Sequence, residues 1–201
     1  MAITQPAQDS LDRGFIVCRR PMLPLTLHDY SPEPDELDRP ARLKLAAGET
    51  GSAVIFVRAL DEDLVLRAYP GPLISKSGYG LENGYGARAI YLRAVADAVE
   101  GVRSYRTPLR PEFLIHSDRL SVKAGDGGQF WLTVEVPAGT PPGDYEGSVK
   151  VAPIDPATGK ESGESAVLLV ILTVRDLRLE EPDVAFPGIT RVREEASSSM
   201  A

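Results

Sequence analysis

Residues 128–151, GQFWLTVEVPAGTPPGDYEGSVKV, contain two alternating segments on either side of a turn rich in proline and glycine. Over residues 129–136 every second side chain is apolar, so one face of this strand belongs to a core and the other carries Trp131. Residues 144–151 alternate as well, which predicts a strand with one dry and one wet side. The prolines and glycines of residues 137–143 predict a tight, stiff crossover between the two strands.

Similar strand-like segments recur on both sides of this stretch, rich in β-branched and aromatic residues and separated by turn signals. Residues 91–99 also fit helical spacing, but the run Ile90, Tyr91, Leu92 favours a strand. Residues 153–163 are typical of the exposed loop of a hairpin. The further predicted strands are residues 41–46, 52–60, 63–68, 88–95, 119–123 and 165–174.

This pattern predicts an all-β fold, an antiparallel β-sandwich of immunoglobulin-like or jelly-roll type with little or no helix. The chain has 201 residues, which suits one such domain. We expect a flexible leader over residues 1–14, the sandwich over 15–186, and a tail or link to a further domain over 187–201.

Residues 166–173 are apolar at almost every position, unlike the alternating strands. We therefore expect both faces of this strand to be covered, either inside the sandwich or by another domain, and we expect the strand to be central. If only another domain covers it, an isolated chain exposes a sticky surface and self-associates.

The charge and the reactive side chains narrow the function classes. A net charge of -7 without any Lys/Arg cluster argues against nucleic acid or an anionic membrane as the main partner. Cys18 is the single cysteine, so an internal disulfide is excluded. The two histidines, His28 and His116, lie far apart in the sequence, so we expect neither a metal site nor a cofactor.

Targeting signals are missing from the sequence as written. Residues 1–14 are polar and lack the apolar region of a signal peptide, and no run reaches the length of a membrane span. The sequence as it stands predicts a cytoplasmic chain; exported relatives would make it a fragment, a processed form or a mis-started reading frame.

Paired carboxylates are the usual machinery of glycoside hydrolysis. The adjacent acids of this chain fall in predicted loops or tails, where charges are normally solvated, so we expect no catalytic role for them. They are Asp35-Glu36, Asp61-Glu62-Asp63, Glu180-Glu181 and Glu194-Glu195. His116 stands beside Ser117 and Asp118, but sequence neighbours rarely form a catalytic triad, and no nucleophile-elbow pattern is present.

Aromatic side chains are the remaining candidates for a site. The glycine-rich residues 78–86 carry Tyr79 and Tyr85, which could stack on sugar rings or pack against the sheet or a neighbouring domain. Alternation places Trp131 on the outer face of its strand. We expect Tyr79, Tyr85 and Trp131 to serve in carbohydrate binding or, more readily, in a domain interface.

Several stretches occur in the same order as in a known domain family. Residues 128–151 resemble the signature of the N-terminal β-sandwich domain of glycoside hydrolase family 123 and of related barrel proteins of unknown function. Residues 19–22 (RRPM), 32–37 (PEPDEL) and 43–60 (LKLAAGETGSAVIFVRAL) agree with the opening of that domain. Residues 174–179 (VRDLRL) resemble its last strand, which leads toward the barrel. The resemblance spans residues 15–186.

The resemblance implies a bacterial protein of carbohydrate metabolism, whose relatives are extracellular or periplasmic. This sandwich would be a non-catalytic accessory domain that packs against a catalytic barrel, in cis or in trans. The family's enzymes use the substrate's own N-acetyl group as nucleophile, assisted by an adjacent Asp-Glu pair on the barrel. That pair has no counterpart here, so we expect no enzyme activity from this chain. A free-standing carbohydrate-binding module, with a glycan as ligand, is the alternative.

Overall fold

The computed structural model describes residues 8–22, 26–37, 39–81, 88–94, 111–115 and 117–177. Within these residues strands predominate, and the helical elements are α1 (Gln8–Arg13) and the 3-10 turn η1 (Pro34–Glu36). The prediction of an all-β fold with little helix is confirmed. Helix α1 lies in the segment expected to be a leader, and none of the described helices is long and apolar enough to cross a membrane.

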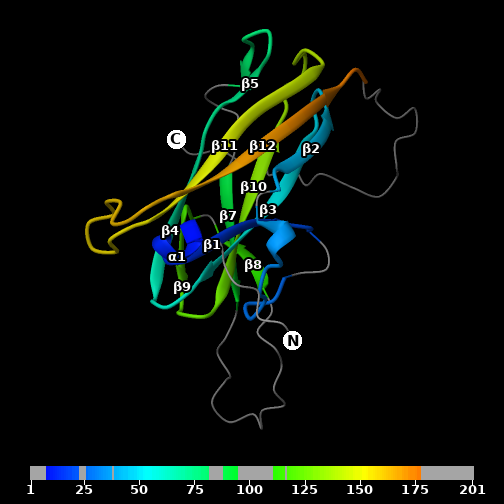
Figure 1. The fold of residues 1–201 in the computed structure, drawn as a ribbon. Helices are drawn as coiled ribbons and strands as arrows, with labels where there is room; N and C mark the ends of the chain where they lie inside the picture. The colour runs from blue at the N-terminus through cyan, green and yellow to red at the C-terminus, as the bar shows by residue number, and fades with distance from the viewer. Residues whose placement is uncertain are drawn as a thin grey trace, which may run out of the picture.

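The strands form two sheets, which pack face to face (Figure 1). Sheet A has the order β1-β3-β10-β7-β8, and sheet B has the order β2-β12-β11-β4-β9 with the β5–β6 hairpin attached to β11. Neighbours are antiparallel except β2 and β12, which run parallel. The bounds in sheet A are β1 Phe15–Arg20, β3 Thr50–Ala59, β7 Arg88–Ala94, β8 Pro111–Ile115 and β10 Gly127–Glu135. Those in sheet B are β2 Ala41–Ala46, β4 Leu64–Pro70, β5 Leu73–Ser75, β6 Gly80–Leu81, β9 Arg119–Val122, β11 Gly143–Pro153 and β12 Ala166–Arg175.

The core lies between the inner faces of the two sheets. The alternation predicted for β10 is confirmed, because its apolar positions are fully buried and belong to the core cluster. They are Phe130, Leu132 and Val134, and Val136 just after the strand continues the pattern. Strand β11 likewise buries Tyr145, Val149 and Val151 while Glu146 faces solvent. Burial of these side chains supplies most of the favourable free energy of folding.

The turn at residues 136–142 carries the chain from β10 in sheet A to β11 in sheet B, as the sequence predicted. The Tyr145 hydroxyl donates to the Pro141 carbonyl at 2.8 Å, four residues upstream, and its ring is buried in the core. This arrangement is that of a tyrosine corner, a device of immunoglobulin-like sandwiches. Gly139 adopts a φ of 87°, which other residues rarely accept. The crossover is therefore anchored at its exit.

Sheet A has a second layer on its outer face. Residues 53–57 of β3 are buried on both sides of the sheet, and the Tyr30 ring meets Phe56 edge-on at 5.6 Å. The buried Gln129 amide donates to the Thr26 carbonyl at 2.6 Å. Gly127 leaves the room that Phe56 needs, since a Cβ there would lie 2.1 Å from its ring. Residues 26–37 thus cover the β1–β3 part of this sheet.

The outer face of β12 corrects one expectation. The strand is an inner member of sheet B, between β2 and β11, so its central place is confirmed. Its inward residues are buried, but Val167 is 66% exposed and Leu169 45% exposed. Covering of both faces inside the sandwich is therefore wrong, because sheet A packs on only one side of sheet B. Cover by another domain stays a prediction.

Seven further predicted strands match observed ones within two residues at each end where described, namely β2, β3, β4, β7, β9, β10 and β11. The segment 153–163 joins β11 to β12 in an antiparallel hairpin, as predicted, and Ile154 bridges Glu161 within it. Residues 88–94 form strand β7, so the strand favoured over the helix is confirmed for these residues. Residues 95–99 lie outside the described residues. Strands β1, β5, β6 and β8 were not predicted.

We predict that Tyr145→Phe lowers the free energy of unfolding by about 1–2 kcal/mol, because the Pro141 carbonyl loses its donor while the ring stays in place. Urea denaturation with a fluorescence readout measures this change. Tyr69→Phe is the matched control, since the Tyr69 ring lies on the outer face of sheet B. Equal losses in both variants would contradict the anchoring role of Tyr145.

Candidate functional site

A polar cluster stands on the outer face of sheet A, where β1 ends. The Arg20 guanidinium contacts the Glu36 carboxylate, donates to the Tyr30 hydroxyl at 2.7 Å and donates to Thr26 at 3.2 Å. The guanidinium carbon also lies 3.9 Å from the centroid of the Tyr30 ring. The Tyr30 hydroxyl donates to the other Glu36 oxygen, which also accepts the Glu33 N–H at 2.9 Å. Both Glu36 oxygens and the Tyr30 hydroxyl thus have partners within the cluster.

The cluster is largely withdrawn from water, with side-chain exposures of 14% for Arg20 and 19% for Glu36. The expectation that the Asp35-Glu36 pair is simply solvated is therefore wrong for Glu36. The reason is the turn η1, which directs Glu36 back toward β1. Asp35 points the other way, is exposed and pairs with Arg39 at 2.5 Å.

The pKa values of these groups show how reactive the cluster is. Burial disfavours the Glu36 carboxylate, but hydrogen bonds from Tyr30 and the Glu33 N–H, with Arg20, hold its pKa below the ordinary 4.5. Burial and the bond to Glu36 raise the pKa of Tyr30 to about 12, and burial chiefly raises that of the Cys18 thiol to about 12. Neither hydroxyl nor thiol is a nucleophile at neutral pH. The arrangement clamps residues 26–37 onto sheet A.

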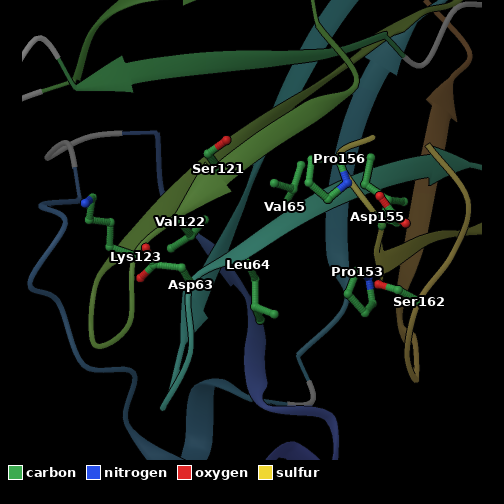
Figure 2. Close-up of a pocket in the computed structure, with 11 residues that line it drawn as sticks. Asp63, Leu64, Val65, Ser121, Val122, Lys123, Pro153, Asp155, Pro156 and Ser162 are labelled. Carbon is green, nitrogen blue, oxygen red and sulfur yellow. The ribbon is translucent and has the colours of Figure 1, made fainter. Parts of the chain in front are cut away.

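An open pocket of about 470 Å³ lies where β4 and β9 meet the 153–163 loop (Figure 2). It contains two carboxylates, each held by a backbone N–H: Asp63 accepts the Ala124 N–H of the β9–β10 turn at 2.9 Å, and Asp155 accepts the Ala157 N–H of its own loop at 2.7 Å. The backbone bonds lower the pKa of Asp155. A glycosidase acid needs a raised pKa, so Asp155 does not fit that role. The pocket is lined by Asp63, Leu64, Val65, Ser121, Val122, Lys123, Pro153, Ile154, Asp155, Pro156 and Ser162.

The aromatic candidates lie on different parts of the sandwich. Tyr79 stands on the turn of the β5–β6 hairpin, is 41% exposed, and meets the buried Tyr145 ring edge-on at 6.2 Å. Trp131 is half-buried on the outer face of sheet A, in register with Val54, and its indole N–H has no hydrogen-bond partner within the described part of the chain. The structure does not bring these two together. Tyr85 and His116 lie outside the described residues.

Among the described residues, the remaining acids and His28 form no further constellation; Glu180-Glu181 and Glu194-Glu195 lie outside these residues. Glu135 and Glu146 are exposed on different sheets, Glu135 at the end of β10 and Glu146 on β11. His28 lies on the covering segment, where its carbonyl accepts the Gly127 N–H at 2.6 Å. Within the described ranges, no group of three or more His, Cys, Asp or Glu side chains could hold a metal ion.

Sequence reasoning missed the Arg20–Tyr30–Glu36 cluster. Its three members come from a strand, a loop and a turn that are brought together only by the fold. The sequence signal was the double arginine at 19–20 followed by the PEPDEL run at 32–37, but no spacing rule pairs them.

Comparison with known proteins gives a broad likeness. No family model and no curated protein matches the chain. Among solved structures, a family 123 glycoside hydrolase from Clostridium perfringens is similar over 68% of this chain, with 15% identity and a TM-score of 0.49. A protein of unknown function from Porphyromonas gingivalis is similar over 67%, with 15% identity and a TM-score of 0.35.

Subunits of bacterial surface fibres are similar too. The CssB subunit of colonization factor CS6 from enterotoxigenic Escherichia coli, complemented with a donor strand from CssA, matches over 68% of this chain and 94% of its own, with 13% identity and a TM-score of 0.39. The chain spans 22% of the glycoside hydrolase and 45% of the Porphyromonas protein. At this level the likenesses do not select one function.

We predict that Glu36→Gln lowers the free energy of unfolding by about 1–2 kcal/mol at pH 7, because Arg20 loses its counter-charge in a largely buried place. The pKa of Glu36 is lower in the folded state, so this stabilisation is present above pH 4.5 and is lost as the pH falls through the folded-state pKa.

The measurement is urea denaturation at pH 7 and pH 3, where the difference between wild type and Glu36→Gln shrinks. Asp35→Asn is the matched control, since its exposed pair with Arg39 contributes little at either pH. A difference that stays constant between the two pH values would refute the clamp.

We also predict that the Cys18 thiol of the folded protein reacts with a maleimide at pH 8 at least about 100-fold more slowly than in 6 M urea, because the thiol is buried and its pKa is about 12. If Cys18 of the folded protein is labelled as fast as in urea, the prediction is wrong, and residues 26–37 open readily.

Proposed function

We propose that this chain is a non-catalytic accessory β-sandwich module of a glycoside hydrolase, which packs against and supports a catalytic barrel. The sequence resemblance of residues 15–186 suggests the barrel. The single observation that carries the proposal is the exposed Tyr79 at the end of the sandwich where β12 finishes.

That end of the molecule carries exposed apolar side chains. The β5–β6 hairpin, the 136–142 turn and the ends of β2 and β12 gather there, in the upper part of Figure 1. Tyr79 rests on Tyr145, whose hydroxyl is tied to Pro141, so the exposed ring is presented on a fixed support. Leu177, just after β12, is also exposed. Preorganised aromatic and apolar groups of this kind are typical anchors of a domain interface.

The chain also leaves β12 at this end of the sandwich. The resemblance implies that residues 174–179 lead toward the barrel, so a barrel in cis would meet the sandwich near Leu177 and Tyr79. An interface in trans would use the same groups.

The positions of the described acids favour a packing role over a catalytic one. Asp35 pairs with Arg39, and Glu135 and Glu146 stand on separate sheets. Of the two carboxylates that line the pocket of Figure 2, Asp63 accepts a backbone N–H and Asp155 has a lowered pKa. Hydrolysis of a glycosidic bond requires two carboxyl groups about 5 to 10 Å apart across one cleft. The alternative, a carbohydrate-binding module, would use Tyr79 as a stacking platform without Trp131 beside it.

The test uses the purified chain with Tyr79→Ser and, as a matched control, Tyr69→Ser on the outer face of sheet B. We expect no hydrolysis of a nitrophenyl N-acetylhexosaminide, no signal on a glycan array, and binding to a family 123 catalytic barrel in calorimetry. Tyr79→Ser should weaken this binding about tenfold or more, and Tyr69→Ser should not.

Two outcomes would overturn the proposal. Specific glycan binding that is lost in Tyr79→Ser would make the chain a carbohydrate-binding module. Hydrolysis by the isolated chain would make it an enzyme in its own right.

A further inference from the structure

The outer face of sheet B carries an apolar stripe along β12, and the second half of this strand runs between side chains of opposite charge. Along β12, Val167, Leu169 and Ile171 point outward, the first two well exposed. Beside Val167, β11 presents Lys150, which pairs with Glu161. Beside Ile171 and Thr173, the neighbouring β2 presents two basic side chains and β11 presents two acidic ones, all four exposed. These are Arg42 and Lys44 on β2, and Asp144 and Glu146 on β11.

The strand register arranges these charges in rows. Ile171 lies between Arg42 and Glu146, and in the next row Thr173 lies between Lys44 and Asp144. One strand separates the two charges of a row, so they are about 10 Å apart and cannot pair directly. Asp144 accepts the Thr173 hydroxyl at 2.7 Å, but none of the four charges makes an ion pair with another described residue.

We propose that this face binds a second copy of the chain across a two-fold axis that runs along β12. Such an axis lies between the two sheets and places each residue opposite the one on the other side of β12 in the same row. Arg42 then faces the partner's Glu146, and Lys44 faces the partner's Asp144. Symmetry repeats both contacts, which gives four ion pairs, two on each side of Ile171 and Thr173.

The stripe itself meets its own copy in this arrangement. Val167, Leu169 and Ile171 pack against the same residues of the second β12, and removal of this apolar surface from water favours association. Sheets that pack face to face lie about 10 Å apart, a distance that these side chains and the long Arg42 and Lys44 can span. The dimer face lies on the outer face of sheet B, and its charged rows end beside the β5–β6 hairpin, since Glu146 is in register with Ile74. The charges and apolar residues that form it are not those that the proposed function uses, so it does not depend on that function.

The arrangement of charges selects a second copy over an unrelated partner. A basic column on one side of the stripe and an acidic column on the other are complementary to themselves after a two-fold rotation. An unrelated partner would have to reproduce both columns at the same spacing.

The test is sedimentation velocity of the full chain from about 1 to 200 µM, the range in which a modest dimer forms. The wild type should dimerise with increasing concentration. Arg42→Glu alone and Glu146→Arg alone should each raise the dimer dissociation constant at least about tenfold, because like charges then face each other twice. An equimolar mixture of the two variants should form a heterodimer, since both of its columns are again complementary.

Two further variants sharpen the result. The double variant Arg42→Glu with Glu146→Arg should recover the homodimer, and Glu135→Arg, a charge reversal at the end of β10 in sheet A, should leave it unchanged. The proposal is overturned if the wild type stays monomeric over the whole range. The proposal is also overturned if neither Arg42→Glu nor Glu146→Arg weakens self-association. It is overturned as well if an equimolar mixture of the two variants does not form a dimer.

Discussion

The hydrogen bond from the Tyr145 hydroxyl to the Pro141 carbonyl holds the point where the chain changes sheets. Strand β10 ends in sheet A, β11 begins in sheet B, and the buried Tyr145 ring joins the turn to the core between them. The same ring supports Tyr79 on the β5–β6 hairpin. One side chain therefore joins the turn to the core at this end and supports the exposed aromatic group on it.

The fold follows closely from the sequence because period-two alternation is a local property. Where one face of a strand is dry and the other wet, as in β10 and β11, both the strand and its inward residues are predictable. Proline and glycine likewise mark the crossover. Strand β1 was missed because residues 15–18 are buried one after another, so they do not alternate.

The candidate sites follow less well, because they depend on contacts between distant segments. Glu36 differs from Asp35 only in the direction that η1 gives it, and no sequence rule shows that it meets Arg20. The outward residues of β12 show the opposite difficulty: apolar composition predicts that they are covered, but it does not say by what. In both cases the sequence shows the charge or hydrophobicity of the side chain, but it does not show which residues contact that side chain.

The parallel pairing of β2 with β12 also bears on how the molecule folds. It joins residues 41–46 to residues 170–175, so about 125 residues separate its two halves. Closing such a loop costs chain entropy before any contact repays it, and domains rich in these distant pairings fold slowly. During synthesis, β2 must wait for β12 to leave the ribosome. Until then its unpaired edge and the apolar core face behind it are exposed to chaperones and to other nascent chains.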